Sequence, residues 1–176
     1  MIRPGSASTA ASLQPRSTAA EVTRSVVLLL VGLAWPAIVH LTPSQIPLGP
    51  ILMPLLLPAA LAAFLLPTRS ALAVCAIMPF LSMATTGMPP APIACGLVAE
   101  GAALVAVVKA LERVHAPWWL AYTGGALASR CVTLMLALLM AGSMAEVGLG
   151  LVGLALSGLL LPVLFAFLGV RRSPGE

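Results

Sequence analysis

From residue 25 onward the chain is a succession of long apolar segments with very few charges inside them. Of its 176 residues, 60% are hydrophobic and 8% are charged, and the mean hydropathy is +1.08. Soluble domains carry about 25% charged residues, so a single soluble core cannot hide this much apolar surface. Lipid must therefore be the solvent for most of the chain, and the sequence predicts an all-α, polytopic membrane protein.

Six apolar segments have the length of membrane-spanning helices or come close to it. They are residues 25–41, 51–66, 71–86, 93–111, 118–141 and 147–170, and a spanning helix needs about 17–25 residues. The second and third are slightly short and could form a re-entrant pair, but this would bury Arg69 at mid-membrane without an evident partner. We therefore expect six transmembrane helices over residues 25–170, a flexible N-terminal tail over residues 1–24 and a C-terminal tail over residues 171–176.

The basic residues predict the orientation of these helices. Eight of the nine Lys and Arg residues flank the expected helices on one side, before residue 25, at Arg69, at 109–113 and after residue 170. The three loops on the other side carry no Lys or Arg. The positive-inside rule then places both termini in the cytoplasm, in a multi-pass protein of the cytoplasmic membrane.

The sequence argues against several classes of function. It contains no Asp or Asn and no GxxxxGK[ST], GxSxG or HExxH motif, so we expect no ATPase, no metal or cofactor site and no catalytic residues. The three cysteines are dispersed one to a segment and are interpreted as small buried hydrophobic residues. No basic face interleaved with aromatic residues is present, which argues against a nucleic-acid partner.

Glu100 and Arg130 are the two charged residues that the expected helices place deep in the membrane. A charge at the bilayer centre costs about 2.5–3.5 kcal/mol or more, so it faces the bundle interior and finds a partner. From the 1.5 Å rise per residue, Glu100 lies about 10–13 Å and Arg130 about 16 Å below the outer helix ends. Either the two residues form a purely structural ion pair between the fourth and fifth helices, or they contact a polar ligand.

The first two loops on the outer side, residues 42–50 and 87–92, are rich in Pro and Gly. Irregular backbone cannot face lipid, but it can line a cavity or form a lid. These loops are therefore either ordinary surface turns or a structured outer mouth that closes over a ligand. His40 lies near the outer end of the first expected helix, on the same side.

A short motif in the second of these loops adds a family resemblance. Residues 86–90 read TGMPP, Glu100 follows in the next helix, and residues 129–132 read SRCV. With the apolar helix at 52–60, these features resemble the substrate-binding S component of energy-coupling factor (ECF) transporters, in particular S components that carry a TGMPP loop. The family's Gly-Arg-x-Val sequence in helix five would correspond to residues 129–132, with Ser in place of Gly.

The resemblance implies a membrane subunit without an ATPase of its own, which captures a small vitamin or vitamin precursor from outside. Its partners would be a transmembrane T component and two ATPase subunits that drive uptake. The candidate substrate-binding residues are Glu100, Arg130, Thr86, Gly87, Met88, Pro89 and His40. The family often docks on the T component through an AxxxA face on helix one, a motif that residues 25–41 lack.

Other functions remain open at this point. The alternatives are a solitary small membrane transporter and a structural membrane adaptor in which Glu100 and Arg130 only hold two helices together. A membrane-embedded enzyme would need a nucleophile with a base, or a metal cluster, at membrane depth, and none is evident. The scarcity of aromatic residues favours a small polar or zwitterionic vitamin over a large planar corrinoid.

Overall fold

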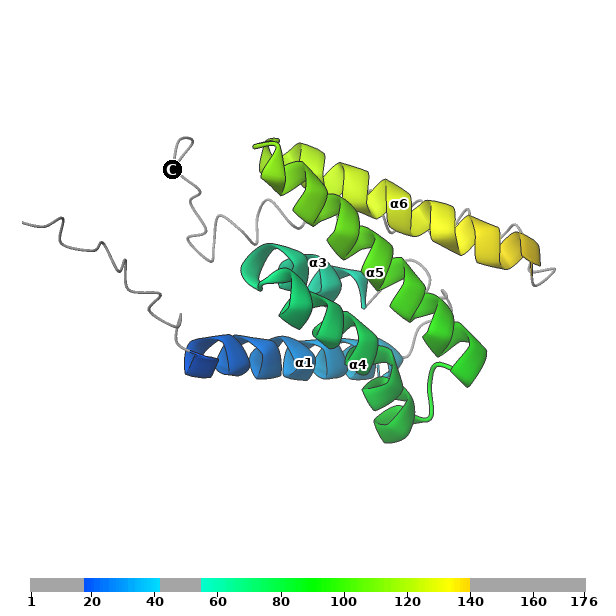
Figure 1. Ribbon diagram of the computed structural model, residues 1–176. Helices are drawn as coiled ribbons and strands as arrows, with labels where there is room; N and C mark the ends of the chain where they lie inside the picture. The colour runs from blue at the N-terminus through cyan, green and yellow to red at the C-terminus, as the bar shows by residue number, and fades with distance from the viewer. Residues whose placement is uncertain (1–17, 42–54, 140–176) are drawn as a thin grey trace, which may run out of the picture.

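The computed structural model describes residues 18–41 and 55–139 (Figure 1). Within these ranges the chain forms helices and no strands, which confirms the all-α prediction for this part of the protein. The helices are α1 (Thr18–Leu41), α3 (Leu56–Leu65), α4 (Thr68–Thr86), α5 (Ala91–Arg113) and α6 (Trp118–Leu139). The expected sixth segment, residues 147–170, and the loop at 42–50 lie outside the described residues.

The first helix begins earlier than the sequence suggested. α1 starts at Thr18, so residues 18–24 are helical instead of belonging to the expected flexible tail. Thr23 and Ser25 donate hydrogen bonds to the carbonyl oxygens of Ala19 and Glu21, each at 2.9 Å. Because Thr and Ser can bond back to the preceding turn, these polar residues are accommodated inside the helix.

Two of the described helices, α4 and α5, are both long and apolar enough to cross a membrane. They make the protein compatible with membrane association, while the full six-span arrangement stays a prediction. The segment expected at residues 51–66 is described as helix only over Leu56–Leu65, which is ten residues. Such a helix is about 15 Å long, half the thickness of the hydrocarbon core.

The junction between α3 and α4 is set by proline. Leu66 has extended backbone (φ −112°, ψ 154°) immediately before Pro67, as expected because the residue before proline avoids helical geometry. Pro67 in turn precedes the first residue of α4, and its carbonyl accepts a hydrogen bond from the Ala71 N–H. The two short expected segments are therefore separate helices joined by a tight connection.

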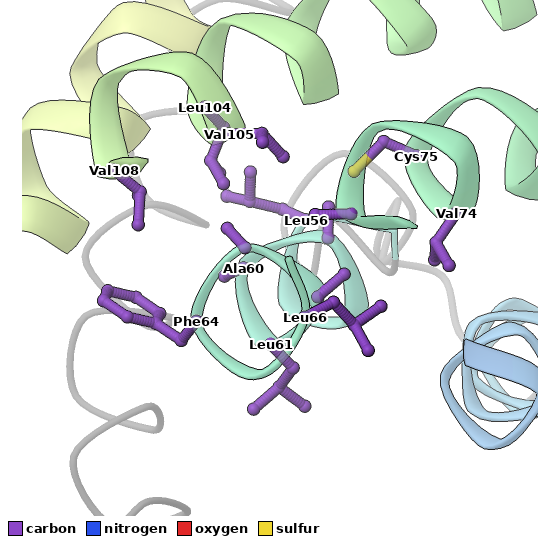
Figure 2. Close-up of a cluster of buried hydrophobic side chains, with 14 of the residues drawn as sticks. Leu56, Ala60, Leu61, Phe64, Leu66, Val74, Cys75, Leu104, Val105 and Val108 are labelled. Carbon is purple, nitrogen blue, oxygen red and sulfur yellow. The ribbon is translucent and has the colours of Figure 1, made fainter. Parts of the chain in front are cut away.

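α3 lies at the centre of the described bundle. Eight of its ten residues are buried, the pattern of a helix enclosed by protein on several sides. Figure 2 shows Leu104, Val105 and Val108 of α5 pointing toward α3, with Cys75 and Val74 of α4 on another side. α3 therefore supplies much of the core on which the longer helices pack.

The described Lys and Arg residues other than Arg130 lie at one end of the bundle. Ser70 donates a hydrogen bond to Glu21 Oε1, which joins the start of α4 to the start of α1. α5 returns to this end, so that Arg113 lies there too, and Arg24 and Arg69 are exposed at helix starts on the same side (Figure 1). The described part thus reproduces the one-sided charge distribution expected from the sequence.

Between its ends, the outer surface of the bundle is strongly apolar. Large hydrophobic side chains are exposed on four helices: Val22, Val26, Val27, Leu30, Val31 and Ile38 on α1, Leu72, Ile77 and Phe80 on α4, Ile93 on α5, and Leu127, Met135 and Leu139 on α6. Soluble monomers rarely expose apolar surface on this scale. The prediction that all three cysteines are buried is wrong for two of them. Cys75 is buried, but Cys95 and Cys131 are exposed, where an apolar exterior tolerates a small hydrophobic residue.

Candidate functional site

Glu100 and Arg130 form an ion pair, one of the two arrangements that the sequence left open. Arg130 Nη2 donates to Glu100 Oε2 at 3.0 Å, and each side chain is only 14% exposed. The contact joins the middle of α5 to the middle of α6. The similar depth expected for the two charges agrees with this contact, and the substrate-binding role of the pair stays a prediction.

Close helix packing explains why the two charges meet. α5 and α6 run antiparallel and lie side by side along their lengths (Figure 1). Gly125 faces the backbone of α5, since a Cβ built there would lie 3.1 Å from the Leu104 carbonyl oxygen and 2.8 Å from Val108 Cγ2. Small residues at helix contacts allow such close approach, and the resulting register brings residue 130 opposite residue 100.

Two hydroxyl residues near Arg130 in α6, Ser129 and Thr133, were not among the expected site residues. Ser129 is completely buried. Thr133 lies within hydrogen-bonding reach of Glu100, and its hydroxyl donates to the Ser129 carbonyl oxygen at 3.1 Å. The position of Thr133 three residues after Arg130 was the signal available in the sequence, because residues three apart share a helix face, whereas the position of Ser129 directly before Arg130 gave no such signal.

The hydrogen-bonding capacity of the site is only partly used. Among the described residues, the buried Arg130 Nε and Ser129 Oγ have no hydrogen-bond partner. Buried polar groups are nearly always hydrogen-bonded in native proteins, so each such group calls for an explanation. Within the same ranges no group of three His, Cys, Asp or Glu residues could hold a metal ion.

The TGMPP sequence forms a well-ordered turn between α4 and α5. Gly87 ends α4 in the left-handed region, at φ +74°, and its N–H donates to the Met83 carbonyl at 2.9 Å. Glycine adopts this conformation without steric cost. The hydroxyls of Ser82 and Thr86 donate to the Met88 carbonyl oxygen at 3.0 and 3.1 Å. Ser82, which is buried, was not among the expected site residues, and its role depends on a contact that spacing alone does not reveal.

The turn and the ion pair occupy different levels of the bundle. Glu100 lies nine residues after Ala91, the first residue of α5, which is about 13 Å along the helix. The structure therefore brings Glu100 and Arg130 together in one place and the candidate loop residues, Thr86 to Pro89, in another. His40 lies in the last turn of α1, and its side chain is outside the described part.

The comparisons with known proteins add no relative. No family model matches the chain, and neither a curated protein nor a solved structure matches it significantly. The functional argument therefore rests on the residues of this chain and on the geometry described above.

Proposed function

We propose that this chain is the membrane-embedded substrate-binding S component of an ECF transporter, which captures a small vitamin or vitamin precursor from outside the cell. The observation that carries the proposal is the Glu100–Arg130 pair, with each side chain 14% exposed, at the middle of two packed helices. Ionisable residues at membrane depth usually mark a substrate or ion pathway. The ordered TGMPP turn and the apolar outer surface further support the proposal.

In this proposal the chain supplies recognition and its partners supply energy. The two ATPase subunits would hydrolyse ATP. Together with a transmembrane T component, they would drive release of the micronutrient into the cytoplasm. The chain would reside in the cytoplasmic membrane with six spanning helices and both termini inside. The turn at residues 86–90 would then face outward, because it lies at the end of the bundle opposite Arg24, Arg69 and Arg113.

The second candidate function is a structural membrane adaptor, or a solitary transporter without ATPase partners. The adaptor is favoured by the same ion pair, because a pair between consecutive helices can serve packing alone. The S component and the adaptor differ in one measurable property, which is the binding of a small molecule by the purified protein.

The first expected result is ligand-dependent stability. In detergent, at least one vitamin or vitamin precursor should raise the midpoint of thermal unfolding, because a ligand that binds only the folded state stabilises it by mass action. At a concentration 100 times the Kd, the stabilisation is about 2.7 kcal/mol. The midpoint is measured with each compound of a panel of micronutrients, and any co-purified ligand is identified by mass spectrometry. A panel without any stabilising compound, in protein that folds normally, would favour the adaptor.

The second expected result concerns orientation. In a background without native cysteines, Met88→Cys should react with a membrane-impermeant maleimide in intact cells, because Met88 is exposed in the α4–α5 turn. Val114→Cys, which is exposed after the end of α5, should react only after permeabilisation. Equal labelling of both positions from outside would contradict the orientation that the charges predict.

A further inference from the structure

The guanidinium of Arg130 has more donors than the pair with Glu100 uses. An arginine carries five N–H donors in a planar fork, and carboxylates often engage two of them at once. Here the structure gives a single hydrogen bond, from Nη2 to Glu100 Oε2. The Nε atom is buried and has no partner among the described residues. One donor of the guanidinium is therefore paired with Glu100, while the buried Nε–H is left without a hydrogen bond.

The other described acidic residues are engaged elsewhere. Glu21 accepts the hydrogen bond from Ser70 at the starts of α1 and α4, and Glu112 pairs with Lys109 at 3.0 Å near the end of α5. Both lie at the basic end of the bundle. Glu112 is about three helical turns along α5 from Glu100. Within the described ranges, there is thus no second carboxylate that could pair with Arg130 Nε.

The charge balance of the site limits what can fill this position. Glu100 already neutralises Arg130, so an added acceptor brings its own charge into a region of low dielectric. A group with one negative charge shares the guanidinium with Glu100, whereas a phosphate monoester brings up to two charges and a correspondingly larger repulsion from Glu100. Among anionic acceptors, charge therefore favours one with a single negative charge, such as a carboxylate, at the unpartnered Nε.

We propose that the captured molecule is a carboxylic acid, whose carboxylate accepts a hydrogen bond from Arg130 Nε while Nη2 remains paired with Glu100. This inference rests on the proposed function and narrows its substrate class. Ser129, which precedes Arg130 in α6, is also fully buried with an unpartnered hydroxyl.

Matched acid and neutral compounds test this inference directly. The wild-type protein in detergent is titrated with biotin and biotinamide, nicotinate and nicotinamide, lipoate and lipoamide, and pantothenate and panthenol, with thermal unfolding and calorimetry as readouts. In at least one pair the acid should bind about 10- to 100-fold more tightly than its neutral partner, the range expected for a charge-assisted hydrogen bond. Arg130→Lys keeps the positive charge but lacks the fork, and should lose most of this preference. Arg69→Lys, an exposed site at the start of α4, is the matched control and should keep it.

The possible failures are distinguishable. Equal affinity for an acid and its neutral partner would overturn the inference, as would binding only of riboflavin, thiamine or pyridoxamine, although the proposed function would stand. Preference for pyridoxal phosphate over every acid would also overturn it and would identify a phosphate site. Absence of binding by all of these compounds would count against the proposed function itself. Because the wild-type comparison needs no variant, the test does not depend on the folding of Arg130→Lys.

Discussion

Replacing Glu100 or Arg130 singly is expected to lower the free energy of unfolding by about 3–5 kcal/mol, the usual cost of leaving one member of a buried pair without its partner. The contact joins the middle of α5 to the middle of α6, and each side chain is only 14% exposed, so little water is available to solvate a stranded charge. Glu100→Gln and Arg130→Met should show this loss in a denaturant titration of the protein in mixed micelles. Arg69→Met, at an exposed position at the start of α4, is the control and should cost much less, because surface substitutions usually change stability little.

The double variant separates structure from binding. Replacing a buried ion pair by uncharged residues of similar size is often neutral or stabilising. Glu100→Gln with Arg130→Met should therefore recover much of the stability that each single change removes, and should still fail to bind ligand if the pair is part of the substrate site. A folded double variant with near-normal ligand affinity would contradict the substrate-binding role and leave Glu100 and Arg130 as a link between two helices.

The sequence was sufficient to predict that these two charges lie at a similar depth, for a simple physical reason, although it left open whether they pair with each other. Charges are so costly in lipid that their depth and mutual proximity are strongly constrained, and a constant rise per residue converts position into depth. The same reasoning located the basic end of the bundle. Both predictions depend on charge and helix geometry, which are visible in the sequence, and on the short connection between consecutive helices.

Other features could not be predicted from the sequence because their signal is ambiguous. The apolar run at 51–66 has the composition of a membrane span, but in the described residues it forms the ten-residue core helix α3. Lipid and protein interior select similar residues, so hydropathy does not distinguish them. The start of α1 at Thr18 was missed because Thr and Ser are common in tails, and the contact between Glu21 and Ser70 that holds this end joins residues far apart in the chain.

The packing of α5 against α6 gives the other large expected effect. Gly125→Ala should destabilise the protein by about 1–3 kcal/mol, the typical cost of overpacking a close contact. A Cβ at residue 125 would meet Val108 Cγ2 at 2.8 Å and the Leu104 carbonyl oxygen at 3.1 Å. A backbone atom cannot rotate away, so the two helices must separate to admit the methyl group. Since the Glu100–Arg130 contact is between the same helices, the change should also weaken ligand binding.

The neighbouring glycine supplies a matched control for this effect. A Cβ at Gly124 would meet only side-chain atoms, Leu111 Cδ1 at 3.0 Å and Val107 Cγ1 at 3.4 Å, and the end of a leucine side chain can move. Gly124→Ala should therefore cost little, with any loss offset by the better helix propensity of alanine. The free energies of unfolding of the two variants are compared in the same detergent. If Gly125→Ala is as stable as Gly124→Ala, then the close approach of α6 to the α5 backbone does not set the register of these helices, and the meeting of Glu100 with Arg130 must depend on the charges themselves.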